Sequence, residues 1–93
     1  MIKVDVDLEV KHYPAQQVFT AQQDTYEARL QYQFLPDTNA LGQKRIDFNS
    51  TYVAPELRGK GIAEKLVRQG LKWAKEQGYE VQASCWYAAK YLR

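Results

Sequence analysis

The chain has 93 residues, of which 45% are hydrophobic and 13% aromatic, and its 13 basic and 11 acidic side chains give a formal net charge of +2. This length and composition fit one domain, taken as residues 1–93, and exclude disordered, collagen-like and repeat proteins. No apolar run approaches the roughly 18–20 residues of a membrane-spanning helix, and so small a net charge does not by itself indicate nucleic acid.

The N-terminal segment alternates apolar and charged residues. This pattern predicts a half-buried strand over residues 2–10 and not a secretory signal peptide. His12-Tyr13-Pro14 is expected to end that strand, with His12 in a solvated position. Residues 18–21 are expected to form a short second strand.

Two further strands are predicted in the middle of the chain. After a turn at Asp24, apolar and polar residues alternate over 28–34, which is typical of an antiparallel strand with one buried face. Pro36-Asp37-Thr38-Asn39 and Gly42 are expected to form a loop. The alternation then continues in a fourth strand through Ile46, Phe48, Ser50 and Tyr52.

A strongly amphipathic helix is predicted over residues 60–77. At about 100° per residue, its apolar residues occupy one half of the helical wheel and its charged residues the other half. Gly70 lies in the middle of the apolar arc, where it would allow close packing on a sheet, and Gly78 is expected to end the helix. The apolar arc consists of Ile62, Ala63, Leu66, Val67, Gly70, Leu71, Trp73 and Ala74.

A fifth strand over residues 79–83 and a final helix over 85–92 complete the predicted order β-β-β-β-α-β-α. Trp86, Ala89 and Leu92 are expected to pack inward from that helix. Because strand–helix–strand crossovers are right-handed and join parallel strands, strands four and five should be parallel. The fold class is therefore α+β, a mixed and mostly antiparallel sheet in which a splay at the parallel join would form a cleft.

Arg58-Gly59-Lys60-Gly61-Ile62-Ala63 stands between the fourth strand and the long helix. Two glycines at a helix start allow the backbone to approach a ligand closely, and the unpaired N–H groups of the first helical turn attract anions. Six basic residues and one acidic residue lie between positions 58 and 75, so positive charge gathers around this turn. The pattern predicts a phosphate cradle, although a plain tight turn would look the same.

The same hexapeptide matches the Arg/Gln-x-x-Gly-x-Gly/Ala signature of the GCN5-related N-acetyltransferase superfamily. Together with Thr51–Leu57 before it, Leu66-Val67 after it and Ser84-Cys85-Trp86-Tyr87, it resembles the small one-domain acetyltransferase-like proteins of the YjdJ type. The resemblance covers roughly residues 17–92, and it suggests that residues 1–12 replace or extend the usual first strand.

This resemblance implies acetyl-coenzyme A (acetyl-CoA) as the co-substrate. The main-chain amides of Arg58–Ala63 would hold its pyrophosphate, and the pantetheine arm would pair with Tyr52 and Val53 at the end of strand four. Lys60, Lys65 or Arg68 could meet the other phosphates. No metal site is expected.

The catalytic machinery is less defined than the binding machinery. The resemblance places Cys85 near the thioester, whereas a free cysteine is usually a small buried hydrophobe. Tyr87 or Tyr91 could donate a proton to the departing thiolate, or could simply pack. The family often has histidine at the position of Ser50 and proline at that of Ala83, and the first departure weakens a histidine–cysteine pairing.

The leading hypothesis is therefore an acetyl-CoA-dependent N-acetyltransferase of an unidentified amine. The alternative is a non-catalytic acetyl- or acyl-CoA-binding module, and a third reading is a nucleic-acid-binding protein that uses the basic helix. No membrane partner is expected, and the oligomeric state stays open. The single cysteine, Cys85, and the absence of a secretory signal favour a reducing, cytoplasmic setting.

Overall fold

The computed structural model describes residues 9–92, with side chains described as far as Tyr91. Its order confirms the predicted succession of four strands, a helix, a strand and a short helix. The elements are β1 (Val10–Tyr13), β2 (Val18–Gln23), β3 (Tyr26–Thr38), β4 (Lys44–Val53), a 3₁₀ turn (Pro55–Leu57), α1 (Ile62–Glu76), β5 (Glu80–Ala83), α2 (Trp86–Ala89) and a second 3₁₀ turn (Lys90–Leu92).

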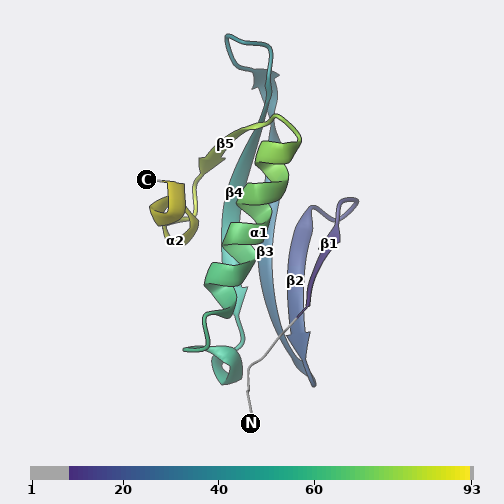
Figure 1. The fold of residues 1–93 in the computed structure, drawn as a ribbon, viewed down its shortest axis with the longest axis vertical. Helices are drawn as coiled ribbons and strands as arrows, with labels where there is room; N and C mark the ends of the chain where they lie inside the picture. The colour runs from purple at the N-terminus through teal and green to yellow at the C-terminus, as the bar shows by residue number, and fades with distance from the viewer. Residues whose placement is uncertain (1–8, 93) are drawn as a thin grey trace.

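The five strands form one sheet in the order β1-β2-β3-β4-β5 (Figure 1). Neighbouring strands from β1 to β4 are antiparallel, whereas β4 and β5 are parallel. The parallel pair follows from the crossover through α1, because a chain that passes along a helix returns to the same end of the sheet. The fold class is therefore the predicted α+β arrangement.

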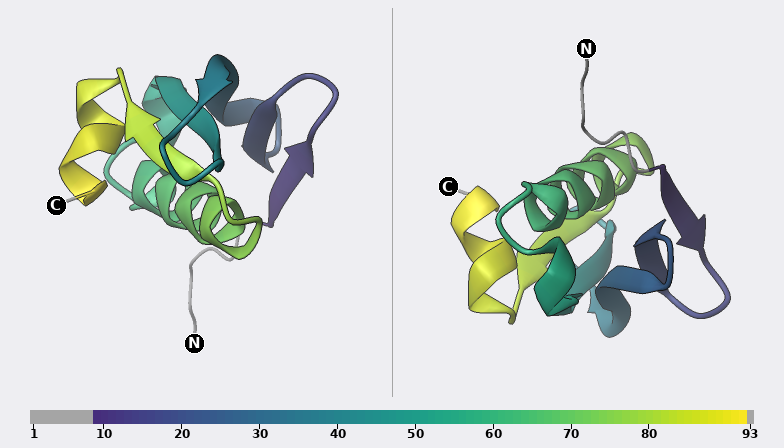
Figure 2. Two further views of the ribbon diagram at one scale, coloured as in Figure 1. Left: turned by 90° about the horizontal axis from the view of Figure 1, so that it is seen from above. Right: turned by 90° about the horizontal axis from the view of Figure 1, so that it is seen from below.

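Helix α1 lies along one face of the sheet, and α2 lies beside β5 at the sheet edge (Figure 2). The core between α1 and the sheet contains Leu30, Ile46, Phe48, Leu66 and Val67, each at most 1% exposed. At Gly70 an added Cβ would lie 2.8 Å from Cδ2 of Leu30 and 3.0 Å from Cε1 of Phe48. The prediction that Gly70 allows close helix–sheet packing is confirmed.

The register of β4 differs from the simple alternation that the sequence suggests. Tyr32 on β3 pairs with Phe48, but the preceding Gln31 pairs with Ser50, so the pairing skips Asn49. Such a β-bulge exchanges the two faces of the strand beyond it. The expectation that Ser50 and Tyr52 share the face of Phe48 is therefore wrong.

The ends of two strands also differ from expectation. His12 and Tyr13 belong to β1 and do not break it, while the predicted strand at residues 2–10 lies mostly outside the described residues. β3 continues to Thr38 and includes Pro36, which was expected in a loop. Proline is tolerated because Pro36 lies in a register irregularity between Phe34 and Thr38, where its missing N–H leaves no ladder bond unmade.

His12 is half-buried and does not occupy the solvated position expected of it. Its ring stacks on Phe19 with 4.0 Å between centroids and an interplanar angle of 5°, and it meets Trp73 edge-on at 4.5 Å. Its Nε2 lies 2.6 Å from the hydroxyl oxygen of Tyr32. Burial lowers the pKa of His12. Because the charged form is disfavoured there, β1 is attached to the core by a neutral aromatic ring.

Candidate functional site: a cleft beside the end of strand β4

The glycine turn is held in place by one buried side chain. After β4 ends, the chain makes the 3₁₀ turn Pro55–Leu57, and Leu57 is 1% exposed in the core. Gly59 and Gly61 then adopt left-handed φ values of 82° and 74°. An added Cβ would meet no atom within 4 Å at either glycine, so backbone conformation and not packing demands glycine there.

The start of α1 presents its backbone amides at this turn. Gly61 is the N-cap and makes no side-chain cap hydrogen bond, so the helix begins at Ile62 and not at Lys60 as predicted. The first N–H groups of a helix have no partners within the helix, and they carry the positive end of its dipole. The turn therefore has the backbone geometry of an anion-binding site.

The end of β4 offers backbone groups to the cleft. The Ala54 N–H donates to Glu27 O on β3, and a trans peptide places the preceding C=O on the opposite side. The C=O of Val53 therefore points away from β3, towards the side where β5 would continue. The β4–β5 ladder ends at the Phe48–Ala83 pair, and Nε of Arg58 donates to the Val53 oxygen over 2.9 Å.

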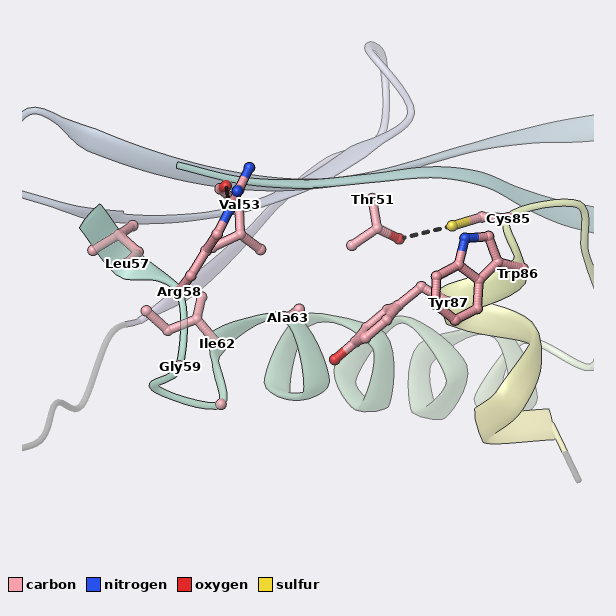
Figure 3. Close-up of a pocket in the computed structure, with 11 residues that line it drawn as sticks. Thr51, Val53, Leu57, Arg58, Gly59, Ile62, Ala63, Cys85, Trp86 and Tyr87 are labelled. Carbon is pink, nitrogen blue, oxygen red and sulfur yellow. Dashed lines mark hydrogen bonds between the residues drawn. The ribbon is translucent and has the colours of Figure 1, made fainter. Parts of the chain in front are cut away.

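A cleft of about 590 Å³ runs from the glycine turn to the start of α2 (Figure 3). Leu57, Arg58 and Gly59 lie at one end, and Thr51, Cys85 and Trp86 lie at the other, with Tyr87 reaching towards α1. The bulge in β4 is what turns Thr51 and Val53 into this space. The lining residues are Thr51, Val53, Leu57, Arg58, Gly59, Gly61, Ile62, Ala63, Cys85, Trp86 and Tyr87.

Cys85 is half-buried at the end of the cleft, where its Sγ lies 3.4 Å from Oγ1 of Thr51. Burial raises the pKa of the Cys85 thiol, but hydrogen bonds from the Thr51 hydroxyl and from the backbone amides of Ala88, Tyr87 and Thr51 lower it by more. The net pKa therefore lies below the ordinary value. The thiolate form is therefore less disfavoured here than in a cysteine that is buried among apolar side chains alone.

Tyr87 lines the cleft, and its hydroxyl lies 3.2 Å from that of Tyr91. Burial, the hydrogen bond to Tyr91 and the negative charge of Glu64 raise the pKa of Tyr87 to about 12. At neutral pH this phenol keeps its proton, so it can donate a hydrogen bond into the cleft but releases the proton reluctantly.

Two of the predicted site residues lie away from the cleft, and Trp86, which does line it, is not packed as expected. The Tyr52 side chain is 40% exposed, faces away from the cleft and lies under the guanidinium of Arg29, 4.7 Å from ring centroid to Cζ. Lys60 is exposed and does not line the cleft. Trp86 is 77% exposed, so the expectation that it packs inward is wrong; in the short helix α2 the buried residue is Ala88.

Sequence reasoning missed the role of Asp47. This carboxylate is 4% exposed, and it accepts hydrogen bonds from the N–H and the hydroxyl of Ser84, each over 2.7 Å. Ser84 directly precedes Cys85. An aspartate between two core residues of a strand, Ile46 and Phe48, was the available signal, because a charge at such a position needs a buried partner.

A second hollow of about 370 Å³ shares Gly61 with the cleft and follows the exposed side of α1. It is lined by Gly61, Glu64, Lys65, Arg68, Gln69 and Lys72. Arg68 is paired with Glu64 over 2.7 Å, one helical turn away. The basic stripe of α1, formed by Lys65, Arg68 and Lys72, is thus continuous with the glycine turn at Gly61.

Residues 17–93 match the sequence model of the family described as GCN5-related N-acetyl-transferase. The chain belongs to this family. The resemblance that the glycine signature suggested is therefore confirmed, and the mostly antiparallel sheet with its parallel β4–β5 join is consistent with the fold expected of that family.

The chain is also similar to the proteins called Protein NATD1 of Xenopus tropicalis, Gallus gallus and Homo sapiens, each 32% identical over 53 residues. The aligned segment covers 57% of this chain and 49%, 48% and 47% of the three relatives, so it spans about half of their length. Among residues 9–92, no helix is long and apolar enough to cross a membrane.

Proposed function

We propose that the protein is an acetyl-CoA-dependent N-acetyltransferase that acts on an amine. The observation that carries the proposal is the continuous cleft between an anion-binding turn at Gly59–Ala63 and a thiol–phenol end at Cys85 and Tyr87. Its two ends suit a ligand that carries phosphates at one end and a reactive thioester at the other. Membership of the acetyltransferase family supports the same ligand.

The phosphate end is the amide cluster at the start of α1. The pyrophosphate would accept hydrogen bonds from the backbone of Gly59–Ala63, where the two glycines leave the approach free of side chains. The basic stripe in the adjoining hollow, with Lys65, Arg68 and Lys72, would attract the remaining phosphate. Lys60, which was predicted at this site, would act by charge alone from its exposed position.

The pantetheine arm would lie along β4 as an added strand. Val53 presents its C=O to the cleft, and Nε of Arg58 occupies that acceptor. An amide N–H of the arm would replace the guanidinium, which would then be free to turn towards the phosphates beside it. Tyr52 would contribute its backbone and not its ring, since the ring faces away.

The acetyl group would lie between Thr51, Cys85 and Tyr87. The neutral amine attacks the thioester carbon, a C–N bond forms, the C–S bond breaks, and the amine proton passes to solvent. The Tyr87 phenol, with a pKa of about 12, donates a hydrogen bond to the departing sulfur instead of fully protonating it. Cys85 would form part of the wall of the acetyl pocket, where its polarisable sulfur would contact the acetyl group.

Calorimetric titration with acetyl-CoA tests the proposal. We expect binding in the micromolar range and free-thiol release when a pool of primary amines is added. Binding without release from any amine would support the alternative, a non-catalytic acyl-CoA-binding module. Absence of heat at millimolar acetyl-CoA would contradict both. Comparing thiol release by wild type and Cys85→Ala would then show whether the thiol takes part in the reaction.

The basic stripe of α1 leaves a nucleic-acid-binding function as a second candidate. Binding to DNA or RNA through Lys65, Arg68 and Lys72 would weaken steeply between about 50 and 200 mM salt. Competition between acetyl-CoA and an oligonucleotide would place both ligands on the same stripe. The cytoplasmic setting stays a prediction.

A further inference from the structure

The segment that carries Cys85 is attached to β4 by two consecutive backbone amides. The Ser84 N–H donates to Oδ1 of Asp47 over 2.7 Å, and the Cys85 N–H donates to the backbone oxygen of Phe48 over 3.2 Å. The Ser84 hydroxyl adds a third bond, to Oδ2 of Asp47, over 2.7 Å. The chain is thus fixed immediately before α2 begins at Trp86.

Asp47 is the buried charge in this arrangement. A carboxylate that is 4% exposed is costly unless it is hydrogen-bonded, and short bonds to a charged acceptor are stronger than neutral ones. In the described part of the chain both of its hydrogen bonds go to Ser84, which lies 37 residues away in the sequence. The carboxylate therefore has one structural target, the corner that leads into Cys85.

With both amides held, the place of the thiol depends mainly on rotation of its own side chain. Cys85 is the N-cap of α2, with extended backbone angles of −72° and 119°, and its C=O accepts from the Ala89 N–H over 2.9 Å. Its Sγ then lies 3.4 Å from Oγ1 of Thr51. Residues 47, 48 and 51 of one strand thus hold Ser84 and Cys85.

We propose that Asp47 is a positioning residue, which acts through Ser84 to hold the Cys85 sulfur against Thr51 at the acyl end of the cleft. The inference rests on the proposed function in placing the acyl group at this end. Its test does not, because the position of the thiol can be measured in the protein without any acyl donor. The lowered pKa of Cys85 agrees with a thiol held in reach of donors.

The rate of alkylation by iodoacetamide, measured against pH by intact mass, reports the acidity of the thiol. Cys85 is the single cysteine of the chain, so every adduct belongs to it. The informative variant is Ser84→Ala, which removes the hydroxyl but keeps the Asp47 charge, so that a change in electrostatic repulsion cannot explain the result. We expect the pH profile to move upward and the rate at pH 7 to fall about fivefold, the factor that one hydrogen bond contributes to an equilibrium.

Asp47→Asn keeps one acceptor oxygen for the Ser84 N–H and should give a smaller shift than Asp47→Ala. Asp37→Asn is the matched control, because Asp37 is an exposed carboxylate on β3 that pairs with Arg45 of β4, the strand of Asp47, and lies outside the cleft. We expect its alkylation profile to equal that of wild type. If Asp47→Ala does not fold, as judged by circular dichroism, Ser84→Ala decides the question.

A double-mutant cycle separates positioning from general support of the fold. If Ser84 acts by holding the sulfur against Thr51, Thr51→Val should shift the profile, and Ser84→Ala should add little in the Thr51→Val background. Additive shifts would overturn the proposal, as would a Ser84→Ala variant with a lower melting temperature and an unchanged profile.

Turnover provides a second readout if the proposed reaction is observed. Ser84→Ala should lower kcat and leave the KM for acetyl-CoA unchanged, because the phosphate cradle lies at the other end of the cleft. A shifted thiol profile in a protein that does not bind acetyl-CoA would contradict the proposed function and leave the positioning role standing.

Discussion

Nε2 of His12 on the edge strand β1 lies 2.6 Å from the hydroxyl oxygen of Tyr32 on β3. Burial, with a contribution from Tyr79, raises the pKa of Tyr32, so the phenol keeps its proton and can donate a hydrogen bond to the imidazole. Burial lowers the pKa of His12, so the ring stays neutral and accepts. Burial therefore favours the neutral form of both groups in this contact.

The first prediction concerns stability against pH. Because the pKa of His12 is lower in the folded than in the unfolded protein, the unfolded state takes up a proton first as the pH falls. The contribution of neutral His12 is complete above about pH 6.5 and is lost as the pH falls through the folded pKa. We expect the melting temperature to fall between pH 7.5 and 5.5.

His12→Gln is the control for this dependence. The protein contains one histidine, so the variant should be less stable at pH 7.5, but its melting temperature should change little between pH 7.5 and 5.5. If the melting temperature of His12→Gln fell with pH as steeply as that of wild type, groups other than His12 would cause the dependence. Thermal denaturation followed by circular dichroism is sufficient for the comparison.

The second prediction concerns the closest helix–sheet contact. Gly70→Ala would bring a Cβ within 2.8 Å of Leu30 and 3.0 Å of Phe48, which are both buried and cannot move without displacing the core. Alanine favours a helix over glycine by about 1 kcal/mol, and overpacking costs about 1–3 kcal/mol. We expect a net destabilisation of about 1 kcal/mol in urea titrations.

Gln69→Ala, on the exposed side of the same helix, provides the reference for this measurement. It should be neutral or slightly stabilising. If Gly70→Ala proved as stable as this variant, the helix would be further from the sheet than the structure places it.

The third prediction uses a set of matched glycines. Gly42, Gly59 and Gly61 have φ values of 80°, 82° and 74°, and an added Cβ would meet no atom within 4 Å at any of them. Replacing any one of them with alanine should therefore lower the free energy of unfolding by a similar amount, about 1–2 kcal/mol. Calorimetry should show weaker acetyl-CoA binding, by about tenfold, for Gly59→Ala and Gly61→Ala but unchanged binding for Gly42→Ala. Equal losses at all three would argue against a phosphate site at the turn.

The fourth prediction separates the two tyrosines of the C-terminal segment. Tyr87→Phe should lower kcat about tenfold with little change in acetyl-CoA affinity, because it removes a hydrogen bond made mainly to the departing sulfur. Tyr91→Phe keeps the Tyr87 hydroxyl and should have a much smaller effect. With a pKa of about 12, Tyr87 should add no limb to the pH–rate profile between pH 6 and 9. Equal losses from the two variants would indicate a packing role for the pair.

The sequence predicted the long elements because their periodicity is strong. The charged and apolar arcs of residues 60–77 do not overlap, and α1 indeed buries Leu66, Val67 and Ala74. The glycine signature also identified the family correctly, and its residues Arg58, Gly59 and Gly61 line the cleft, whereas their role in binding a cofactor stays a prediction. These features depend on short stretches of chain, so a local pattern is enough to reveal them.

Features that depend on distant partners could not be predicted in the same way. Nothing near Asn49 in the sequence distinguishes a bulge from continued alternation, since the register is set by pairing with β3. His12 is half-buried because Phe19, Tyr32 and Trp73 converge on it from three other elements. The hydrogen bonds from Ser84 to Asp47 likewise join residues that meet through the crossover.

The bulge at Asn49 has a consequence for how much change in length β4 can tolerate. Phe48, under α1, and Thr51, at the cleft, face the same side although three positions separate them, whereas an uninterrupted strand would require two or four. Deleting Asn49 would leave Phe48 and Thr51 two positions apart, which is the spacing of residues on one face of a regular strand, so Phe48 would stay in the core and Thr51 would still point towards Cys85. The extra residue at the bulge therefore makes β4 tolerant of a one-residue deletion at this point, whereas a deletion in a regular strand would exchange the two faces beyond it.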